Sequence, residues 1–238
     1  GKTTTVLNLG VASALAGNRT CLVDMDAQGN LTKTFTQLQP GQPTVFHSLN
    51  YGSLLYDIQV KTNIPDLYLV PAGNNLARLE RSGAGDPRLH SRLSKALINY
   101  AEDFELMLID TPPTLGALTL NAMTAAHGLF IPIQPSFYPL QGTNDLLETY
   151  RLVKRNMNTN LDLLGVLITL YDPRTSLARE VETEIRRVLP KETLNTVIHR
   201  SVKLEESVAQ GQSIFTYAPK SKAAEEYQAA YKELMDRA

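Results

Sequence analysis

Short apolar runs alternate with longer amphipathic segments along most of this chain of 238 residues. The apolar runs are typical of buried strands, and the segments between them have the spacing of helices. Strands that are apolar throughout and separated by helices form mostly parallel sheets covered on both faces, so we predict a doubly wound α/β fold. The expected strands span 19–24, 67–71, 104–110, 128–133, 163–170 and 195–198, and the expected helices span 3–16, 88–101, 115–126, 141–156, 176–188 and 219–236.

The segments between these elements give weaker signals. Residues 25–66 are polar and rich in turn formers, and we expect two short helices there. The glycine-rich GAGDP at 83–87 follows no expected strand and is interpreted as a loop. Because no internal repeat or linker divides the chain, residues 1–238 are predicted to form a single domain.

The composition narrows the class of protein. With 43% hydrophobic and 20% charged residues, the chain can fill a core, and its net charge of -1 gives no overall attraction to nucleic acid or anionic lipid. The single cysteine, Cys21, lies in the apolar run TCLVD and is interpreted as a core residue. No run approaches the roughly 18 apolar residues of a membrane span, so we expect a cytoplasmic protein.

The first residues, GKTTTVLNLG, match the end of a phosphate-binding loop. The backbone N–H groups at the start of a helix favour a bound phosphate, Lys2 can neutralise β- and γ-phosphate oxygens, and the Thr3 hydroxyl can ligate Mg²⁺. On its own, this tripeptide also fits a capped helix at the protein surface. A phosphate loop normally follows a central strand, so we expect a strand and the first half of the loop to precede Gly1.

Two aspartate signals follow apolar strands. Asp110 ends the run LMLI, where a carboxylate beside a phosphate loop can hold Mg²⁺ or its water. In CLVDMDAQGN, Asp24 ends a strand and Asp26 begins a loop that can orient the attacking water and sense the γ-phosphate. A helix cap for Asp110 and a simple turn for Asp26 are the alternatives. Because ligands of parallel sheets bind beyond the carboxyl ends of the strands, the three signals together predict an ATP-type phosphate site.

These motifs carry a resemblance to a known family. GKTTTVLNLG, VDMDAQGNLT, LIDTPPTLGALTLNAMTAA, IPIQPSFYPLQG and TLYDPRTSLAREV occur in the order seen in the ParA/Soj partition ATPases, which belong with MinD to the deviant-Walker group of P-loop NTPases. The family loop reads KGGxGKTT, and its first lysine would precede Gly1. Relatives that position protein cargo, such as the carboxysome-distributing McdA branch, depart from the pattern there.

The resemblance implies roles for individual residues. Lys2 would bind phosphate with Gly1 and Thr4, Thr3 would ligate Mg²⁺, Asp26 would act on the hydrolytic water, and Asp110 would be the Walker B carboxylate. Asp24 would support the metal. Residues at the positions of Leu170 and His199 flank the adenine in similar proteins, although the family usually has proline where this chain has His199.

Several competing classes lack their markers. The sequence contains no N-K-x-D segment, the motif with which GTPases read guanine. One cysteine cannot hold an iron–sulfur cluster, and the four histidines are too scattered for a metal site. A MinD-like membrane role would need a basic amphipathic tail. The tail AAEEYQAAYKELMDRA instead has mixed charges and a weak apolar stripe, which is typical of a helix packed on its own domain.

DNA is a better candidate partner. Between Arg174 and Lys203 the sequence has seven basic residues and four acidic ones, although such a surplus is often only a solvated face. Arg174 matches an arginine that similar proteins use for nonspecific DNA contact, and Lys203 stands where they have another arginine. Arg200 belongs to the same candidate DNA surface, and Lys220 and Lys222 can extend it.

The resemblance therefore implies an ATP-controlled switch. ATP and Mg²⁺ would close a homodimer that binds DNA nonspecifically on the nucleoid, and a ParB-like or other cargo adaptor would stimulate slow hydrolysis. We expect the adaptor near helix 141–156 and SFYPLQG. The alternatives are a MinD-like membrane-associated ATPase and a scaffold that ATP dimerises with negligible turnover.

Overall fold

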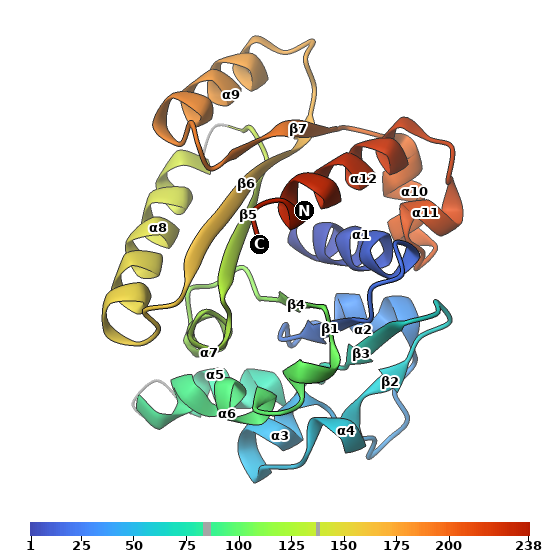
Figure 1. The fold of residues 1–238 in the computed structure, drawn as a ribbon, viewed down its shortest axis with the longest axis vertical. Coiled ribbons are helices and arrows are strands. Elements are labelled where there is room, and N and C mark those ends of the chain that lie inside the picture. Colours follow the sequence, from blue (N-terminus) through green and yellow to red (C-terminus); the bar gives the residue numbers. More distant parts are fainter. Residues whose placement is uncertain (83–86, 137–138) are drawn as a thin grey trace.

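The computed structural model describes residues 1–82, 87–136 and 139–238, and it confirms the α/β fold (Figure 1). Within those ranges the strands form two hydrogen-bonded sheets of order β2-β3-β1-β4 and β5-β6-β7. All pairings are parallel except that of β2 with β3. The strands are β1 Thr20–Asp24, β2 Val60–Lys61, β3 Leu67–Val70, β4 Leu106–Asp110, β5 Gly128–Ile133, β6 Asp162–Tyr171 and β7 Thr193–His199.

Helices cover these sheets, and every long helix that the sequence predicts is present except 88–101. The helices are α1 Lys2–Leu15, α2 Asn30–Phe35, α3 Val45–Tyr51, α4 Leu55–Ile58, α5 Leu76–Ser82, α6 Arg92–Leu97, α7 Ala117–Ala125, α8 Pro139–Asn156, α9 Ser176–Val188, α10 Val202–Ala209, α11 Ile214–Tyr217 and α12 Lys222–Met235. Two 3-10 helices, η1 Pro87–Ser91 and η2 Ala101–Asp103, flank α6.

The prediction of one helix over 88–101 is wrong. The segment is η1, α6 and η2 in sequence, and Asn99 between the last two has a left-handed φ of 64° that no α-helix accommodates. Residues 25–66 hold three short helices rather than two, and α5, α10 and α11 were not expected from the sequence. Most of the GAGDP loop, residues 83–86, lies outside the described residues.

Helix α1 is buried between the two halves of the fold (Figure 1). Leu7 and Val11 pack with residues of β1 and β3, and on another side Leu9 and Ala12 pack with residues of β6, β7 and α12. A Cβ at Gly10 would lie 2.5 Å from Leu22 Cδ2, so a larger residue here would force the buried Leu22 side chain of β1 to shift. An apolar helix surrounded in this way is a core element, and its N-terminus is held firmly at the edge of the sheets.

The C-terminal helix α12 is packed on the domain, as its sequence indicates. Tyr227, Tyr231 and Leu234 are buried in the same cluster as Leu9 of α1. The apolar stripe that a membrane-binding helix would present to lipid is therefore covered by the protein itself. In the described ranges, no helix combines the length and the apolar character needed to cross a bilayer.

The sheet register brings two predicted site residues together. Asp24 and Asp110 are paired neighbours at the carboxyl ends of β1 and β4, and the backbone N–H of Met25 donates to the Asp110 carbonyl at 2.8 Å. Within the described ranges no ladder joins β4 to β5. The strand expected before Gly1 stays a prediction.

Candidate nucleotide site

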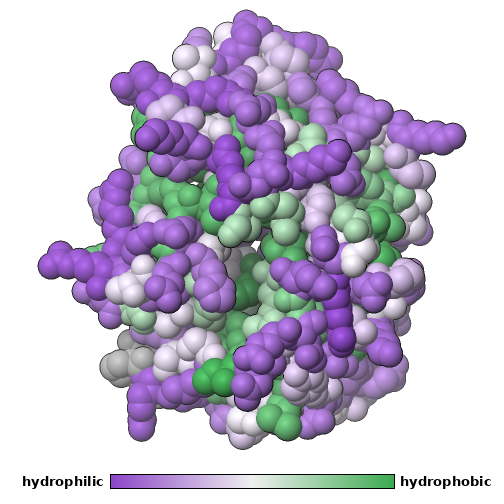
Figure 2. All heavy atoms as spheres, viewed as in Figure 1, coloured by the Kyte–Doolittle hydropathy of each residue, from purple (hydrophilic) through white to green (hydrophobic). Residues whose placement is uncertain are grey.

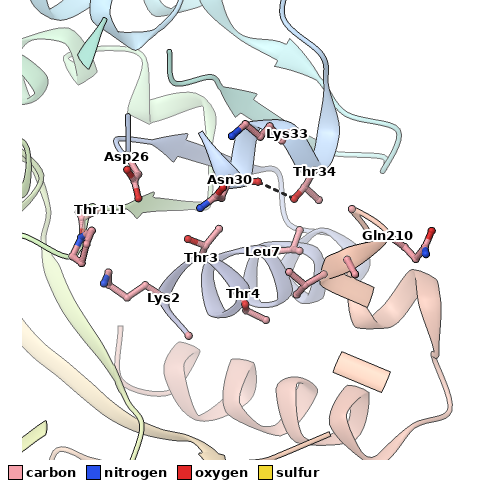
Figure 3. Close-up of a pocket in the computed structure, with 15 residues that line it drawn as sticks. Lys2, Thr3, Thr4, Leu7, Asp26, Asn30, Lys33, Thr34, Thr111 and Gln210 are labelled. Atoms are coloured by element: carbon pink, nitrogen blue, oxygen red, sulfur yellow. Dashed lines mark hydrogen bonds between the residues drawn. The ribbon is translucent and has the colours of Figure 1, made fainter. Parts of the chain in front are cut away.

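A cavity of about 810 Å³ opens at the start of α1 (Figure 3). It is bounded by α1, by the loop after β1 with α2, by the loop after β4, and by the end of α10. Its lining comes from residues far apart in the sequence: Gly1, Lys2, Thr3, Thr4, Leu7, Asp26, Asn30, Lys33, Thr34, Thr111, Pro113, Val208, Ala209, Gln210 and Gly211.

The start of α1 is suited to an anion. Gly1 is the N-cap and supplies no capping side chain, and the first turn of this helix of 14 residues contains no acidic residue. The positive end of the helix dipole therefore faces the cavity, and no acidic side chain of the first turn neutralises it. Lys2 and Thr3 extend from this turn toward the loops that carry Asp26 and Thr111 (Figure 3). A Cβ at Gly1 would lie 3.0 Å from Thr169 Oγ1, so this first residue packs closely against the end of β6.

Asp110 is a buried carboxylate without a hydrogen bond. The residue is 1% exposed, and neither carboxylate oxygen has a hydrogen-bond partner among the described residues. Burial raises the pKa of Asp110 to about 7, and the charges of Asp24 and Asp26 add to the rise. The nearby Thr3 hydroxyl, which does not reach hydrogen-bond geometry, and the Lys2 charge oppose it. Because an orphaned buried carboxylate is costly to the fold, this group is suited to a cation or to a water bound to one.

Asp24 lies beside Asp110 in the sheet but its oxygens are occupied. Oδ1 accepts from the backbone N–H of Asp26 at 3.0 Å, and Oδ2 accepts from the backbone N–H and hydroxyl of Thr32 at 2.9 and 2.7 Å. The Thr32 hydroxyl in turn accepts from the Ala72 N–H at 2.9 Å. Asp24 thus ties the loop 25–32 to the sheet, and its pKa is raised by burial in spite of these bonds. The structure supports a positioning role for Asp24.

Asp26 lies on the loop that Asp24 holds. Its Oδ1 accepts from the Gln28 N–H at 2.9 Å, which is the turn interaction that the sequence left open, and its side chain lines the cavity. Gly29 follows with a left-handed φ of 60°. Across the turn, Lys33 Nζ donates to the Gln28 carbonyl at 2.6 Å. Asp26 accepts this turn hydrogen bond and still lines the cavity, so its carboxylate can face a bound phosphate.

The sequence analysis did not find the distal wall of the cavity. Asn30, Lys33 and Thr34 come from α2, which begins four residues after Asp26. The signal that could have found them is the helical spacing of the polar residues after Gly29. The segment 208–211 closes the far end, where Gly211 has a φ of 62° and its Cβ position lies 3.8 Å from the Thr34 backbone. No local pattern in the sequence indicates that contact.

Leu170 and His199 do not line this cavity. They lie at the carboxyl ends of the paired strands β6 and β7, beyond Thr169, which contacts Gly1. Leu170 has a left-handed φ of 53°. His199 is held by Glu226, whose Oε2 accepts from the His199 N–H at 2.9 Å while Oε1 lies 2.7 Å from Nδ1. The adenine-flanking role of Leu170 and His199 stays a prediction.

The described residues contain no cluster of three His, Cys, Asp or Glu side chains that could enclose a metal ion. Mg²⁺ rarely needs such a cage, because it keeps several waters and binds through one or two carboxylates together with substrate phosphates. Thr3 and the orphaned Asp110 fit that pattern of ligation.

The predicted DNA residues lie on the second sheet's side of the molecule. Arg174, Arg200 and Lys203 have side chains that are 86%, 67% and 58% exposed. The Arg200 N–H donates to the Tyr171 carbonyl at 3.0 Å, which brings the loops after β6 and β7 together. Figure 2 shows many hydrophilic side chains over the upper part of the molecule, where α9 lies.

Comparison with known proteins is decisive on the family. Residues 1–163 match a family model described as "AAA domain". The Bacillus subtilis sporulation initiation inhibitor protein Soj is 38% identical over 228 residues, which are 95% of this chain and 90% of Soj. The Myxococcus xanthus chromosome partitioning protein ParA is 37% identical over 238 residues, which are 100% of this chain and 84% of ParA. This chain belongs to the Soj/ParA family.

A solved structure extends the likeness of this Soj/ParA family member to three dimensions. Mycobacterium smegmatis cobyrinic acid a,c-diamide synthase with bound ADP and magnesium superposes with a TM-score of 0.84 at 32% identity. The match covers 98% of this chain and 88% of that structure. The predicted resemblance to ParA/Soj proteins and the predicted P-loop α/β fold are confirmed.

Proposed function

We propose that this Soj/ParA family member is an ATP-controlled switch that segregates or positions a cargo on DNA. ATP and Mg²⁺ close two copies into a homodimer in the cytoplasm, and the dimer binds the nucleoid without sequence preference. A ParB-like or other cargo adaptor stimulates slow hydrolysis and releases the protein. The observation that carries the ATPase assignment is the orphaned, buried Asp110 carboxylate beside the uncapped start of α1.

The residues that line the cavity and the buried aspartates Asp24 and Asp110, which do not line it, divide the chemistry among them. The N-terminus of α1 and the Lys2 ammonium bind the phosphates, with Gly1 and Thr4 completing the loop. Asp26 orients a water for attack on the γ-phosphate from the loop that Asp24 and Lys33 hold in place. Thr3 and Asp110 would hold Mg²⁺, which when bound neutralises charge on the phosphate oxygens.

The name of the Mycobacterium smegmatis protein refers to a different reaction, the synthesis of an amide. If such a reaction proceeded through a cysteine nucleophile, it would need a reactive, low-pKa thiolate. Cys21 is the chain's single cysteine, it is buried, and burial raises its pKa to about 12. A buried thiol of this kind is inert, so the cysteine gives such a synthase no support. Phosphate chemistry is therefore the assignment that we retain.

The adaptor surface is proposed on α8. This helix lies at the side of the second sheet, and Leu152 on it is 60% exposed. Residues 137–138 of the SFYPLQG segment lie outside the described residues, so the prediction there is carried by α8 alone. The cargo itself would be chosen by the adaptor.

The experiment that tests this function is binding of an unrelated DNA duplex by the full-length protein with ATP, with ADP and without nucleotide. Binding that requires ATP and Mg²⁺ and weakens between about 50 and about 200 mM salt is the expected result. Arg174→Glu should abolish this binding while ATP binding persists. Absence of DNA binding in every state, together with ATP-dependent binding to anionic liposomes, would replace the DNA switch by the MinD-like alternative.

A very slow turnover that no adaptor raises would instead favour the scaffold that ATP dimerises. Single-turnover hydrolysis with and without the cognate adaptor distinguishes the switch from the scaffold. A switch must hydrolyse ATP and release DNA as fast as its cargo moves, whereas a scaffold need not.

A further inference from the structure

The three predicted DNA cations are each already bound to a carboxylate of the same chain. Arg174 makes a two-pronged ion pair with Asp172, with Nε to Oδ1 at 2.8 Å and Nη2 to Oδ2 at 2.7 Å. Arg200 Nε lies 3.3 Å from Glu205 Oε1, and Lys203 Nζ lies 3.0 Å from Glu206 Oε2.

These carboxylates remove the local positive surplus. When the segment is extended by a few residues to Asp172 and Glu206, its seven basic residues face seven acidic ones, since Asp172, Glu205 and Glu206 join the four already counted. The chain's own anions thus occupy the places that DNA phosphates would take. The three cations lie on one edge of the molecule, because the hydrogen bond from the Arg200 N–H to the Tyr171 carbonyl joins the loops after β6 and β7. Arg200 is close enough to Asp172 for its charge to help lower the pKa of that carboxyl.

Two of the carboxylates also accept a hydrogen bond from a donor other than the cationic side chain. Asp172 Oδ1 also accepts from the Arg174 backbone N–H at 3.1 Å. Glu206 Oε2 also accepts from the Tyr217 hydroxyl of α11 at 2.9 Å. The ion pair with Arg174 lowers the pKa of Asp172 to about 2, and Lys203 with Tyr217 lowers that of Glu206, so both stay charged at neutral pH. They would remain beside the surface after their cations have turned to a phosphate.

We propose that Asp172, Glu205 and Glu206 are built-in competitors for the three cations and that they set the DNA affinity of this protein. This inference rests on the proposed function. Each DNA contact must replace an intramolecular ion pair, whereas an unpaired cation would release only a bound counterion. In a dimer, once one patch has bound DNA, the second patch is held close to the same duplex. This high effective concentration offsets the competition from the carboxylates.

The test is a triple variant, Asp172→Asn, Glu205→Gln and Glu206→Gln, which keeps side-chain size and removes the three charges. We call it the patch variant. With ATP and Mg²⁺, we expect the Kd for an unrelated duplex to tighten about tenfold, since each exposed pair contributes a few tenths of a kcal/mol to about 1 kcal/mol. The dependence of log Kd on log salt should steepen, by up to about 0.9 for each cation freed to contact a phosphate.

The matched control is Asp57→Asn, Glu102→Gln and Glu105→Gln. It changes the net charge by the same amount, from exposed positions around α4 and η2 at the opposite end of the molecule (Figure 1). Its DNA affinity should stay within about twofold of the parent protein, because charges beyond a Debye length are screened. ATP binding and thermal unfolding of both triple variants should match the parent protein.

The outcomes separate the two proposals. If the parent protein binds DNA with ATP and the patch variant binds no more tightly, the competitors are refuted while the DNA switch stands. If the control tightens binding as much as the patch variant, overall charge is responsible and the inference is also refuted. If neither the parent nor the patch variant binds DNA, the proposed function fails and takes this inference with it.

Discussion

The carboxyl ends of β1 and β4 are neighbours in one sheet, and each presents a buried aspartate, yet the two side chains are in opposite situations. Asp24 accepts three hydrogen bonds and fixes a loop, while Asp110 has no partner among the described residues. Identical chemistry at paired positions therefore serves two purposes. A saturated carboxylate stabilises the fold, and an unsaturated one is available to a ligand at a cost in stability.

The largest effect that separates them should be on turnover by Asp110→Asn. An amide cannot carry the negative charge that we propose to hold Mg²⁺ or its water, so we expect hydrolysis to fall by about 10³-fold. Measurement of kcat with saturating ATP and Mg²⁺ gives the number. Turnover within about threefold of the parent protein would show that Asp110 does not serve the metal.

Asp26→Ala should have the next largest effect, because it removes the group that we propose to face the attacking water while leaving the loop anchored by Asp24. We expect hydrolysis to fall by about 10²-fold with ATP affinity nearly unchanged, and the ATP-bound dimer to persist on DNA. A titration with a fluorescent ATP analogue and a hydrolysis assay provide the two numbers. Normal turnover in this variant would refute the role given to Asp26.

Asp24→Asn should act mainly on stability. An amide can accept on one side only, so some of the donors of Asp26 and Thr32 would lose their partner, at a cost of about 2 kcal/mol in the free energy of unfolding. Urea unfolding without nucleotide measures this, with exposed Asp57→Asn as the control that should change stability by less than about 0.5 kcal/mol. An unchanged midpoint would mean that the loop is held by other contacts.

The smallest effect is the reverse one: without nucleotide, Asp110→Asn should raise stability by about 1 kcal/mol above pH 7, because it removes an uncompensated buried charge. The pKa of Asp110 is about 7 in the folded protein, above its ordinary value of 3.8, so the folded state holds this proton more tightly. The stability that this proton provides is fully present below about pH 4 and is lost as the pH rises through about 7. Unfolding midpoints across this range should converge for variant and parent at low pH, and parallel curves would contradict the assignment.

The sequence was sufficient for those parts of the fold that apolar periodicity determines. The strands that end in Asp24 and Asp110 were predicted because buried parallel strands are apolar throughout, and their ends mark the site. The contrast between the two aspartates could not be predicted, since it depends on Thr32 and Ala72, which the loop brings back to Asp24 through tertiary structure.

Other parts were missed for reasons of length and distance. Helices α10 and α11 have only eight and four residues, which is too short for a periodic signal to stand out. The cavity wall at 208–211 meets α2 across more than 170 residues. The positive surplus of this segment was overestimated because the counted window excluded Asp172 before it and Glu205 and Glu206 after it, which pair with its cations. The net charge of a sequence window is a poor measure of local surface charge where ion pairs join residues inside the window to residues outside it.

Helix α1 binds the proposed phosphates at one end and packs along its length with both halves of the fold. Nucleotide binding therefore couples to global unfolding: free energy gained at Lys2 and Thr3 protects amides throughout α1 and reaches Tyr227 and Tyr231 of α12 through their shared core. In hydrogen exchange, the C-terminal helix should thus report nucleotide occupancy although it contributes no residue to the cavity.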